Sequence, residues 1–182
     1  GAKRPMIWAG QGVLYAQASA ALTEFAELLG APVMTTLLGK SAFNEQHPLS
    51  LGTGTYTRTE MVRDYLERCD VIFAVGTSLS RSLFVPQIPP DKQIVHATVD
   101  ACDLNKEYPA DVSILGDAKL VLAQMLYEFQ AHGAPCEEAR GKVEQHLASI
   151  RESWRARWAP KLASEEVPLN PYRVIGDLMM MF

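Results

Sequence analysis

The chain has 182 residues, of which 48% are hydrophobic and 21% charged, and its formal net charge is -4. A chain of this length and composition can form one globular domain, or one domain with an appendage, and can bury a core without disulfides or metals. The slight negative charge and the lack of a basic block argue against nucleic acid as a partner, and no apolar stretch is long enough to span a membrane.

The cysteines indicate a reducing compartment. There are three, Cys69, Cys102 and Cys136, and they are scattered along the chain. An odd number of isolated cysteines favours free thiols, buried or idle, over a disulfide framework. No CxxC pair is present to suggest a zinc site. We therefore expect a cytoplasmic location.

The first part of the chain predicts strands that alternate with helices. Met6–Ala9 is a short apolar run, typical of a buried strand, and Gln17–Leu29 has the apolar spacing of a helix. Val33–Thr36 predicts a second strand. Residues 37–56 are rich in Gly, Ser, Pro and Asn and predict a long loop of the kind that usually has a function. Arg58–Glu67 carries its apolar residues on one helical face.

The same alternation continues beyond residue 70. Val71–Val75 is an unbroken apolar run, which is typical of a parallel strand covered on both faces. A long loop over residues 77–92 leads to a strand at residues 94–99. Asp111–Leu115 predicts a further short strand. This pattern predicts a parallel α/β sheet with helices on both faces.

Helical patterns fill the C-terminal part. Asp117 is placed to cap a helix at Ala118–Gln130, and Glu137–Trp158 is charged with apolar residues three or four apart. Pro160–Pro168 predicts a polar linker. Asn170 is then expected to cap a last amphipathic helix, with Pro171 in its first turn. Because this helix ends on an apolar run, we expect the chain to be a piece of a longer polypeptide.

The pattern divides into three segments. Residues 1–135 are expected to form a Rossmann-like domain, residues 136–160 a helix that packs on or extends it, and residues 161–182 a linker and the start of another, truncated domain. Ligands of parallel α/β sheets bind beyond the carboxyl ends of the strands. The notable turns fall at that edge: Gly10–Gly12, Thr35–Gly39, Gly76–Ser80, Asp100 and Gly116–Asp117.

The motif Gly10-Gln11-Gly12 follows the first predicted strand and has two interpretations. A dinucleotide-binding fingerprint requires a third glycine, where this chain has Tyr15. The motif is therefore either a phosphate-cradling turn or a strand-to-helix turn that needs small residues. Asp100 is either a partner for ribose hydroxyls or a cap of the next turn. Arg81 either meets a phosphate or lies in solvent.

Read together, the segments resemble the central domain of thiamine diphosphate-dependent enzymes, the relatives of acetolactate synthase, benzoylformate decarboxylase and oxalyl-CoA decarboxylase. The resemblance rests on "RPMIWAGQGV", "LGAPVMTTLLGKSAFNEQHPLSLGTGT", "RCDVIFAVGTSLS" and "IVHATVDACDLNKEYPADVSILGDAK", in consistent order over about three quarters of the chain. "NPYRVIGDL" resembles the opening of the next, pyrophosphate-binding domain. The family fold is a Rossmann-like sheet of about six strands, followed here by a C-terminal helical tail.

The resemblance implies an enzyme that decarboxylates a 2-oxo acid and often joins the fragment to a second carbonyl compound. In the full-length enzyme, thiamine diphosphate and magnesium are held by a pyrimidine-binding and a pyrophosphate-binding domain. The chain has no G-D-G motif for this purpose, so we expect it to be inactive alone and to depend on those two domains of the same polypeptide. The family usually builds its active site between two subunits, which implies a homo-oligomer.

Some central domains of this family bind FAD or ADP, and others bind nothing and act as scaffold. The resemblance places the nucleotide contacts on Gly10, Gly12, Thr36, Leu37, Gly52, Gly76, Thr77, Ser78, Asp100, Gly116 and Asp117. Members that bind FAD tend to carry G-A-R-F-D-D-R after the third strand, where this chain has "GTSLSRS" with Ser78 at the arginine position. The first Asp of the family's H-I-D-I-D is Thr98 here. These departures favour a domain that has kept the fold and lost or weakened the nucleotide.

Two other hypotheses remain. The chain is also interpretable as a free-standing FAD-, NAD- or ADP-binding module of a redox protein, although that function predicts a complete glycine fingerprint. It is equally interpretable as a purely structural spacer and assembly surface, which is compatible with the first hypothesis at the level of the whole enzyme. Retention of a nucleotide after purification distinguishes a binding module from a spacer.

Overall fold

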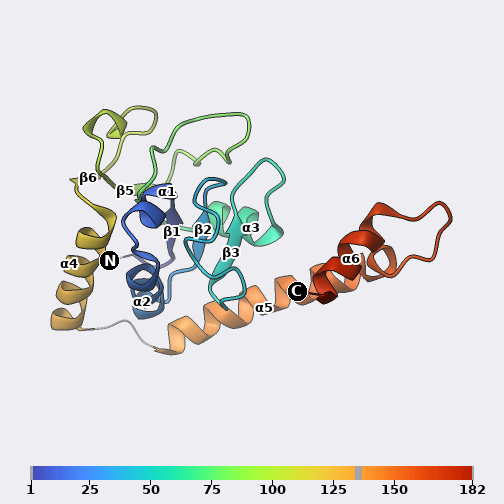
Figure 1. Cartoon of the computed structure of the whole chain (residues 1–182). Coiled ribbons are helices and arrows are strands. Elements are labelled where there is room, and N and C mark those ends of the chain that lie inside the picture. Colours follow the sequence, from blue (N-terminus) through green and yellow to red (C-terminus); the bar gives the residue numbers. More distant parts are fainter. Residues whose placement is uncertain (1, 134–136, 182) are drawn as a thin grey trace. The chain divides into compact units, whose positions relative to one another are not determined.

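The computed structural model describes residues 2–133 and 137–181. Six parallel strands form one sheet in the order β3-β2-β1-β4-β5-β6 (Figure 1). The strands are β1 (Pro5–Ala9), β2 (Val33–Thr35), β3 (Ser50–Thr53), β4 (Val71–Val75), β5 (Gln93–Thr98) and β6 (Val112–Leu115). The helices are α1 (Gln11–Tyr15), α2 (Ser19–Leu29), α3 (Glu60–Arg68), α4 (Ala118–His132), α5 (Glu137–Leu162) and α6 (Pro171–Met181), with a 3-10 helix, η1, at Ala101–Asp103. The predicted Rossmann-like fold is confirmed.

The strand order reverses beside β1. The chain builds from β1 through β2 to the edge strand β3, then returns to the other side of β1 and continues from β4 to β6. Ligands of open α/β sheets bind beyond the carboxyl ends of the strands at such a reversal. The turns after β1 and β4 are therefore the first place to look for a site.

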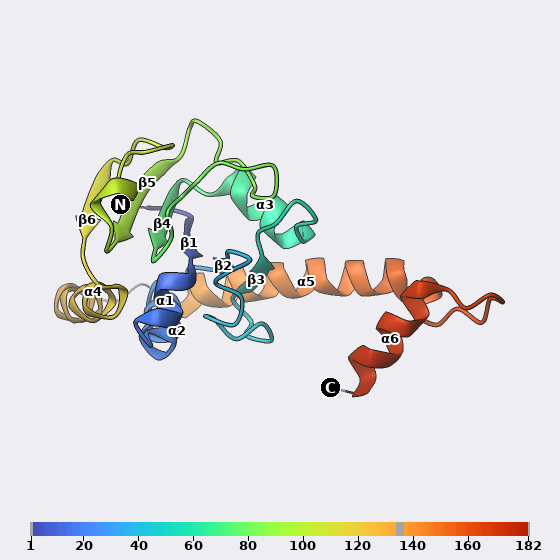
Figure 2. The ribbon, with the colours of Figure 1, turned by 45° about the horizontal axis from the view of Figure 1, so that its top comes forward.

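Helices cover both faces of the sheet and form two cores. On one face Phe25 of α2 and Leu122 of α4 are fully buried, and the ring of Phe25 meets Phe73 edge to face with centroids 5.6 Å apart. On the other face Val62 of α3 and Leu147 of α5 are fully buried. Figures 1 and 2 show α1, α2 and α4 on one side of the strands and α3 on the other.

The two cores explain why β4 has no polar alternation. Ile72 and Ala74 point into the core under α3, and Phe73 and Val75 point into the core under α2 and α4. A strand buried on both faces needs apolar residues at every position. The prediction of Val71–Val75 as a covered parallel strand is confirmed with the same bounds.

The predicted helix at residues 17–29 is wrong in its first turn. The structure has two helices here, α1 at Gln11–Tyr15 and α2 at Ser19–Leu29. They meet at Gln17, whose φ of 52° is left-handed and cannot continue a helix. The amide of Ala18 donates to the carbonyl of Val13 at 2.9 Å and closes this turn.

The predicted loop at residues 37–56 contains a strand that the pattern did not reveal. β3 covers only Ser50–Thr53, and its pairing with β2 has a register irregularity between Val33 and Met34. A strand of four residues that includes Gly52 has neither the length nor the β-branched content of a recognisable strand.

Two predicted caps are confirmed at the C-terminal helices, and one predicted linker is too long. Asp117 accepts from the amides of Lys119 and Leu120, and Asn170 accepts from the amide of Tyr172 at 3.0 Å. The helix predicted to end at residue 158 continues to Leu162, although Pro160 lies in its last turn and removes one N–H donor from the helical hydrogen bonds.

The chain divides into two compact units, Gly1–Leu147 and Ala148–Phe182. In the second unit the rings of Trp154 and Trp158 stack with centroids 6.0 Å apart, and Trp158 lies 4.9 Å from the ring of Tyr172 on α6. The predicted domain boundary at residues 135 and 136 lies outside the described residues, and the three-segment division stays a prediction.

Two of the three cysteines can be placed, and both are free, as expected. Cys69 is buried, and burial raises the pKa of its thiol to about 11, so it is unreactive at neutral pH. Cys102 is exposed, and Cys136 lies outside the described residues. None of the helices at residues 2–133 and 137–181 is long and apolar enough to cross a membrane.

Asp70 fastens the start of the chain to the turn before β4. Its carboxylate accepts from the amides of Lys3 at 2.6 Å and Arg4 at 2.9 Å. Burial alone raises the pKa of Asp70, but the backbone amides of Lys3, Arg4, Asp70 and Val71 outweigh it and hold the pKa below its ordinary value. The carboxylate therefore favours the folded state while it is ionised.

We predict that Asp70→Asn lowers the free energy of unfolding at pH 7 by about 1–3 kcal/mol, as expected for charge-assisted hydrogen bonds. The native pKa is depressed, so this contribution is complete above the unfolded pKa of about 3.9 and is lost as the pH falls through the native value. Urea unfolding of both proteins from pH 7 downward should show the difference shrink in acid. Glu138→Gln removes an exposed pair with Lys142 and serves as control. A constant difference across the pH range contradicts the assignment.

Candidate functional site

A crevice of about 490 Å³ opens at the carboxyl edge of the sheet, next to the point where the strand order reverses. The loops after β1, β2, β4, β5 and β6 all contribute to its walls. Nine of the predicted site residues line it: Gly12, Thr36, Leu37, Gly76, Thr77, Ser78, Asp100, Gly116 and Asp117. The structure thus brings together residues from five loops that are far apart in the sequence.

Gly10 and Gly52 are the two predicted site residues that do not line the crevice. Gly52 belongs to β3 with a φ of 84°, and a Cβ there would lie 3.1 Å from Cγ2 of Thr59. Its role is to let the chain turn next to α3. Gly10 lies behind the crevice wall, where it packs against the turn after β4.

The two turns beside the strand reversal touch through their backbones. The amide of Gly12 donates to the carbonyl of Gly76 at 2.8 Å, and the amide of Gly10 donates to Val75 at 2.9 Å. A Cβ on Gly12 would lie 2.7 Å from the Cα of Gly76. A Cβ on Gly76, whose φ is 61°, would lie 2.7 Å from the amide nitrogen of Val13. All three glycines are therefore required by packing alone.

This contact bears on whether Gly10-Gln11-Gly12 cradles a phosphate. A phosphate-binding turn offers free amides at the start of a helix. Here the amide of Gly12 is bonded to Gly76, and the amide of Val13 is bonded to Gly10 at 3.2 Å. The helix that follows, α1, has only five residues. The geometry favours the interpretation of a strand-to-helix turn that needs small residues.

The loop after β2 is held against β1. The amide of Thr36 donates to the carbonyl of Ala9, and the Thr36 hydroxyl accepts from the amide of Gly39 at 2.9 Å. A Cβ on Gly39 would lie 2.8 Å from the carbonyl carbon of Gly10. This packing places Thr36 and Leu37 on the crevice wall.

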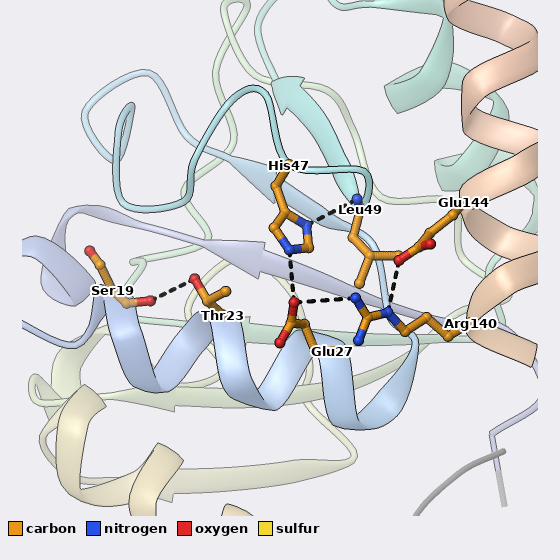
Figure 3. A network of polar contacts seen from close by, with 7 residues as sticks. All are labelled: Ser19, Thr23, Glu27, His47, Leu49, Arg140 and Glu144. Atoms are coloured by element: carbon orange, nitrogen blue, oxygen red, sulfur yellow. Dashed lines mark hydrogen bonds and ion pairs between the residues drawn. The ribbon is translucent and has the colours of Figure 1, made fainter. Parts of the chain in front are cut away.

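The far end of the same loop is tied to two helices by the polar network in Figure 3. The amide of Leu49 donates to Nδ1 of His47 at 3.1 Å, so Nε2 carries the proton and donates to Glu27 on α2 at 3.1 Å. Arg140 on α5 reaches the same Glu27 oxygen at 3.2 Å and Glu144 at 2.8 Å. His47 lies in the loop between β2 and β3 and positions the end of that loop against α2.

The two predicted aspartates cap helices from inside the crevice. Asp100 accepts from the amide of Cys102 at 2.9 Å at the start of η1. Asp117 accepts from the amide of Lys119 at 2.9 Å at the start of α4. Asp100 therefore caps the next turn, which is one of its two predicted roles. It also lies on the crevice wall, so the other role, a partner for ribose hydroxyls, stays a prediction.

The crevice is acidic. Asp103 joins Asp100 and Asp117 on its walls, and no Lys or Arg lines it within the described residues. Lys106 lies behind Asp103, at 3.9 Å. Arg81 stacks on the ring of Tyr108, with its guanidinium 4.4 Å from the centroid, and is not a wall residue. A diphosphate in this crevice would meet three carboxylates and no cation on the walls, so FAD and ADP do not fit its charge.

Two buried polar atoms lie under the crevice without a partner in the described part of the chain. His96, fully buried on β5, donates from Nε2 to the carbonyl of Thr77 at 2.7 Å, and its Nδ1 has no partner. His96 is therefore a packed histidine of the core. Trp8 on β1 is 2% exposed, and its indole N–H has no partner. Trp8 is itself part of the crevice wall.

The described residues offer no cluster of ligands for magnesium. No group of three His, Cys, Asp or Glu side chains in residues 2–133 and 137–181 is close enough to hold a metal ion. These residues do not fit the magnesium of a thiamine diphosphate centre.

The sequence missed several wall residues. Trp8, Tyr15, Leu38 and Asp103 line the crevice although none of them was among the predicted nucleotide contacts. Tyr15, Leu37 and Leu38 are large apolar residues that are more than half exposed, and they form an apolar rim. The adjacent residues Leu37 and Leu38 in an otherwise polar loop are the sequence feature that could have indicated this rim. No pattern in the sequence marks Trp8 as a wall residue, because a tryptophan in a predicted strand is expected to lie in the hydrophobic core.

Comparisons with known proteins agree on one family. Residues 1–125 match the model of the thiamine pyrophosphate enzyme central domain. A protein of Methanocaldococcus jannaschii named "Probable acetolactate synthase large subunit" is 35% identical over 179 residues, which are 97% of this chain and 29% of that protein. The acetolactate synthase isozyme 3 large subunit of Escherichia coli is 32% identical over 181 residues, 97% of this chain and 31% of that protein. The chain thus spans about 30% of these curated relatives.

A solved structure shows the same fold. It is described as "a putative thiamin diphosphate-dependent enzyme isolated from Mycobacterium smegmatis", and its sequence is 30% identical. The TM-score is 0.58, and the match covers 70% of this chain and 25% of the other.

We predict that Gly76→Ala lowers the free energy of unfolding by about 2–4 kcal/mol, because it combines a left-handed φ with a backbone clash. Gly141→Ala is the matched control. Gly141 is in α5, and a Cβ there would meet nothing beyond its own helix within 4 Å, so alanine should be neutral or should stabilise by up to about 1 kcal/mol. Urea unfolding measures both. Equal stabilities of the two variants would show that the turns can move apart at little cost.

Proposed function

Since the chain belongs to the thiamine pyrophosphate enzyme family as its central domain, we propose that it works within an acetolactate synthase-like enzyme that acts on a 2-oxo acid. The observation that carries this proposal is the match of the central-domain model to residues 1–125, supported by the parallel fold. Pyrimidine-binding and pyrophosphate-binding domains would supply the remaining parts of the active site.

Bound thiamine diphosphate supplies the carbanion chemistry of such an enzyme, with magnesium as its anchor. The residues of this chain would have a structural role in that enzyme. Their backbone contacts hold the sheet and its carboxyl-edge loops in a fixed arrangement, which suits a scaffold between two catalytic domains. A homo-oligomer and a cytoplasmic location are part of the same proposal.

We further propose that the crevice does not serve as a FAD or ADP site. Ser78 stands where the resemblance expects an arginine, and its hydroxyl lies 3.0 Å from that of Ser80. Arg81 lies on Tyr108 instead of the crevice wall. The loss of charge-assisted bonds of about 1.5–3 kcal/mol each is enough to lose a diphosphate. This reasoning also disfavours the free-standing redox module.

A domain exchange tests the first part. We expect the Escherichia coli isozyme 3 large subunit to keep measurable acetolactate formation when this chain replaces the segment that it matches. The same subunit without that segment should make none, and this chain alone should make none with thiamine diphosphate and magnesium added. A soluble exchange protein whose activity is no higher than that of the deletion would contradict a shared domain role.

Calorimetric titration tests the second part. We predict no retained flavin after purification and no heat with FAD or ADP at micromolar concentration. Ser78→Arg should gain ADP affinity by about tenfold or more, because it adds a cation to the wall beside the diphosphate position. Ser82→Arg, on an exposed residue that does not line the crevice, is the control. Micromolar binding of ADP to the unaltered chain would overturn the assignment.

A further inference from the structure

The imidazole of His47 closes the far end of the loop between β2 and β3, and both of its nitrogens are bonded (Figure 3). Nδ1 accepts from the amide of Leu49 at 3.1 Å, and Nε2 donates to Oε1 of Glu27 at 3.1 Å. The side chain of His47 is 13% exposed, and the ring of Phe43 packs against it edge to face with centroids 4.8 Å apart. Groups from the loop and from α2 therefore fix the ring in one orientation.

The bond to Leu49 can exist only while the imidazole is neutral. Both nitrogens of an imidazolium carry protons, so neither of them accepts a hydrogen bond. A proton on Nδ1 would face the N–H of Leu49, and a hydrogen bond would give way to two opposed donors. The bond from Nε2 to Glu27 survives, because an imidazolium also donates to a carboxylate. Protonation thus breaks one of the two bonds and keeps the other.

The charged side chains around this imidazole come from α2, from α5 and from the loop itself. Glu27 of α2 is the direct partner, and Arg140 of α5 donates to the same Oε1 atom at 3.2 Å. Arg140 also donates to Glu144 at 2.8 Å. On the loop, Lys40 and Glu45 pair with each other at 3.0 Å. Because Arg140 holds Glu27 in place, the ring stays on α2 after protonation, and the loop backbone is the part that moves.

The backbone at Leu49 is sensitive to the loss of this bond. The side chain of Leu49 is fully buried in the core under α2 and α4, and its carbonyl accepts from the amide of Val33 on β2 at 2.9 Å. A buried N–H without an acceptor costs more than a made hydrogen bond contributes. Leu49 also lies directly before β3, which is an edge strand with one neighbouring strand. A movement at Leu49 is therefore passed to the edge of the sheet.

We propose that His47 is a pH-sensitive switch for the far end of the loop between β2 and β3. At neutral pH the imidazole accepts from the amide of Leu49 and holds the loop end against α2. In mildly acidic solution, where histidine gains its second proton, the amide is released while the ring stays on Glu27. The switch goes beyond the proposed function, because it needs neither a cofactor nor the neighbouring domains.

The near end of the same loop is held by groups that do not titrate in this range. The amide of Gly39 donates to the hydroxyl of Thr36 at 2.9 Å, and the amide of Thr36 donates to the carbonyl of Ala9 at 2.9 Å. Hydroxyl and peptide groups keep their protons in mild acid. The crevice-wall residues Thr36 and Leu37 therefore stay in place while the far end of the loop responds. The amide of Gly39 is thus an internal control.

Hydrogen exchange followed by NMR tests the switch in the unaltered chain. Between about pH 7.5 and pH 5, the protection factor of the Leu49 amide should fall about fivefold or more, and that of Gly39 should change less than about twofold. The nitrogen shifts of the His47 ring should show a proton on Nε2 alone at the higher pH and on both nitrogens at the lower. Three results overturn the proposal: a neutral ring protonated on Nδ1, a ring that stays neutral in acid, or unchanged protection of Leu49 beside an imidazolium.

Two variants attribute the response to one histidine. His47→Asn offers a side-chain carbonyl that accepts from the amide two residues on and does not titrate, so Leu49 should stay protected at both pH values. His146→Asn is the matched control: it removes a histidine of α5 whose Nε2 lies 2.7 Å from Asp64 on α3, and it should leave the response of Leu49 unchanged. A response that persists in His47→Asn contradicts the switch. If that variant fails to fold, the ring shifts and the exchange of the unaltered chain still decide.

Discussion

The packing of the Gly10–Gly12 turn against Gly76 is the contact on which this structure depends. No side chain fits between the two backbones, so the amide of Gly12 reaches the carbonyl of Gly76 at 2.8 Å. β1 and β4 pair along their whole length, and this contact continues their closeness into the turns that follow them, where the strand order reverses. The loops that follow the other strands then pack around this pair, as the contact of Gly39 with Gly10 shows. The position of the crevice follows from the closeness of two turns.

Glycine-rich turns often serve two purposes at once, close packing and phosphate binding, and this contact serves only the first. Close packing of the turns requires small residues, whereas binding a phosphate requires free amides or cations. This chain meets the first demand in full. It does not meet the second at this turn, because Gly12 and Val13 use their amides within the protein and no Lys or Arg lines the crevice among the described residues. The close packing of the turns therefore needs no bound phosphate to explain it.

The sequence was sufficient wherever the signal was local. The unbroken run Val71–Val75 and the caps Asp117 and Asn170 were predicted because strand burial and capping depend on neighbouring residues. The order of the turns along the chain also located nine wall residues, since all parallel strands end at one edge. β3 was missed because pairing with β2, and not its own composition, makes a strand of Ser50–Thr53. The unpartnered N–H of Trp8 depends on contacts across the whole sheet, which no local pattern contains.

Local hydrogen bonds explain only part of why three carboxylates, those of Asp100, Asp103 and Asp117, line the crevice. Asp100 and Asp117 each accept backbone amides at a helix start, and this accounts for a short polar side chain at both positions. The charge has a structural reason as well at Asp117, because the dipole of the 15-residue helix α4 stabilises a carboxylate at its start. Asp103 caps nothing in the described residues and adds a third charge, offset only by Lys106 at 3.9 Å. The negative charge of the crevice therefore comes partly from helix starts and partly from Asp103, and it disfavours an anionic ligand at these walls.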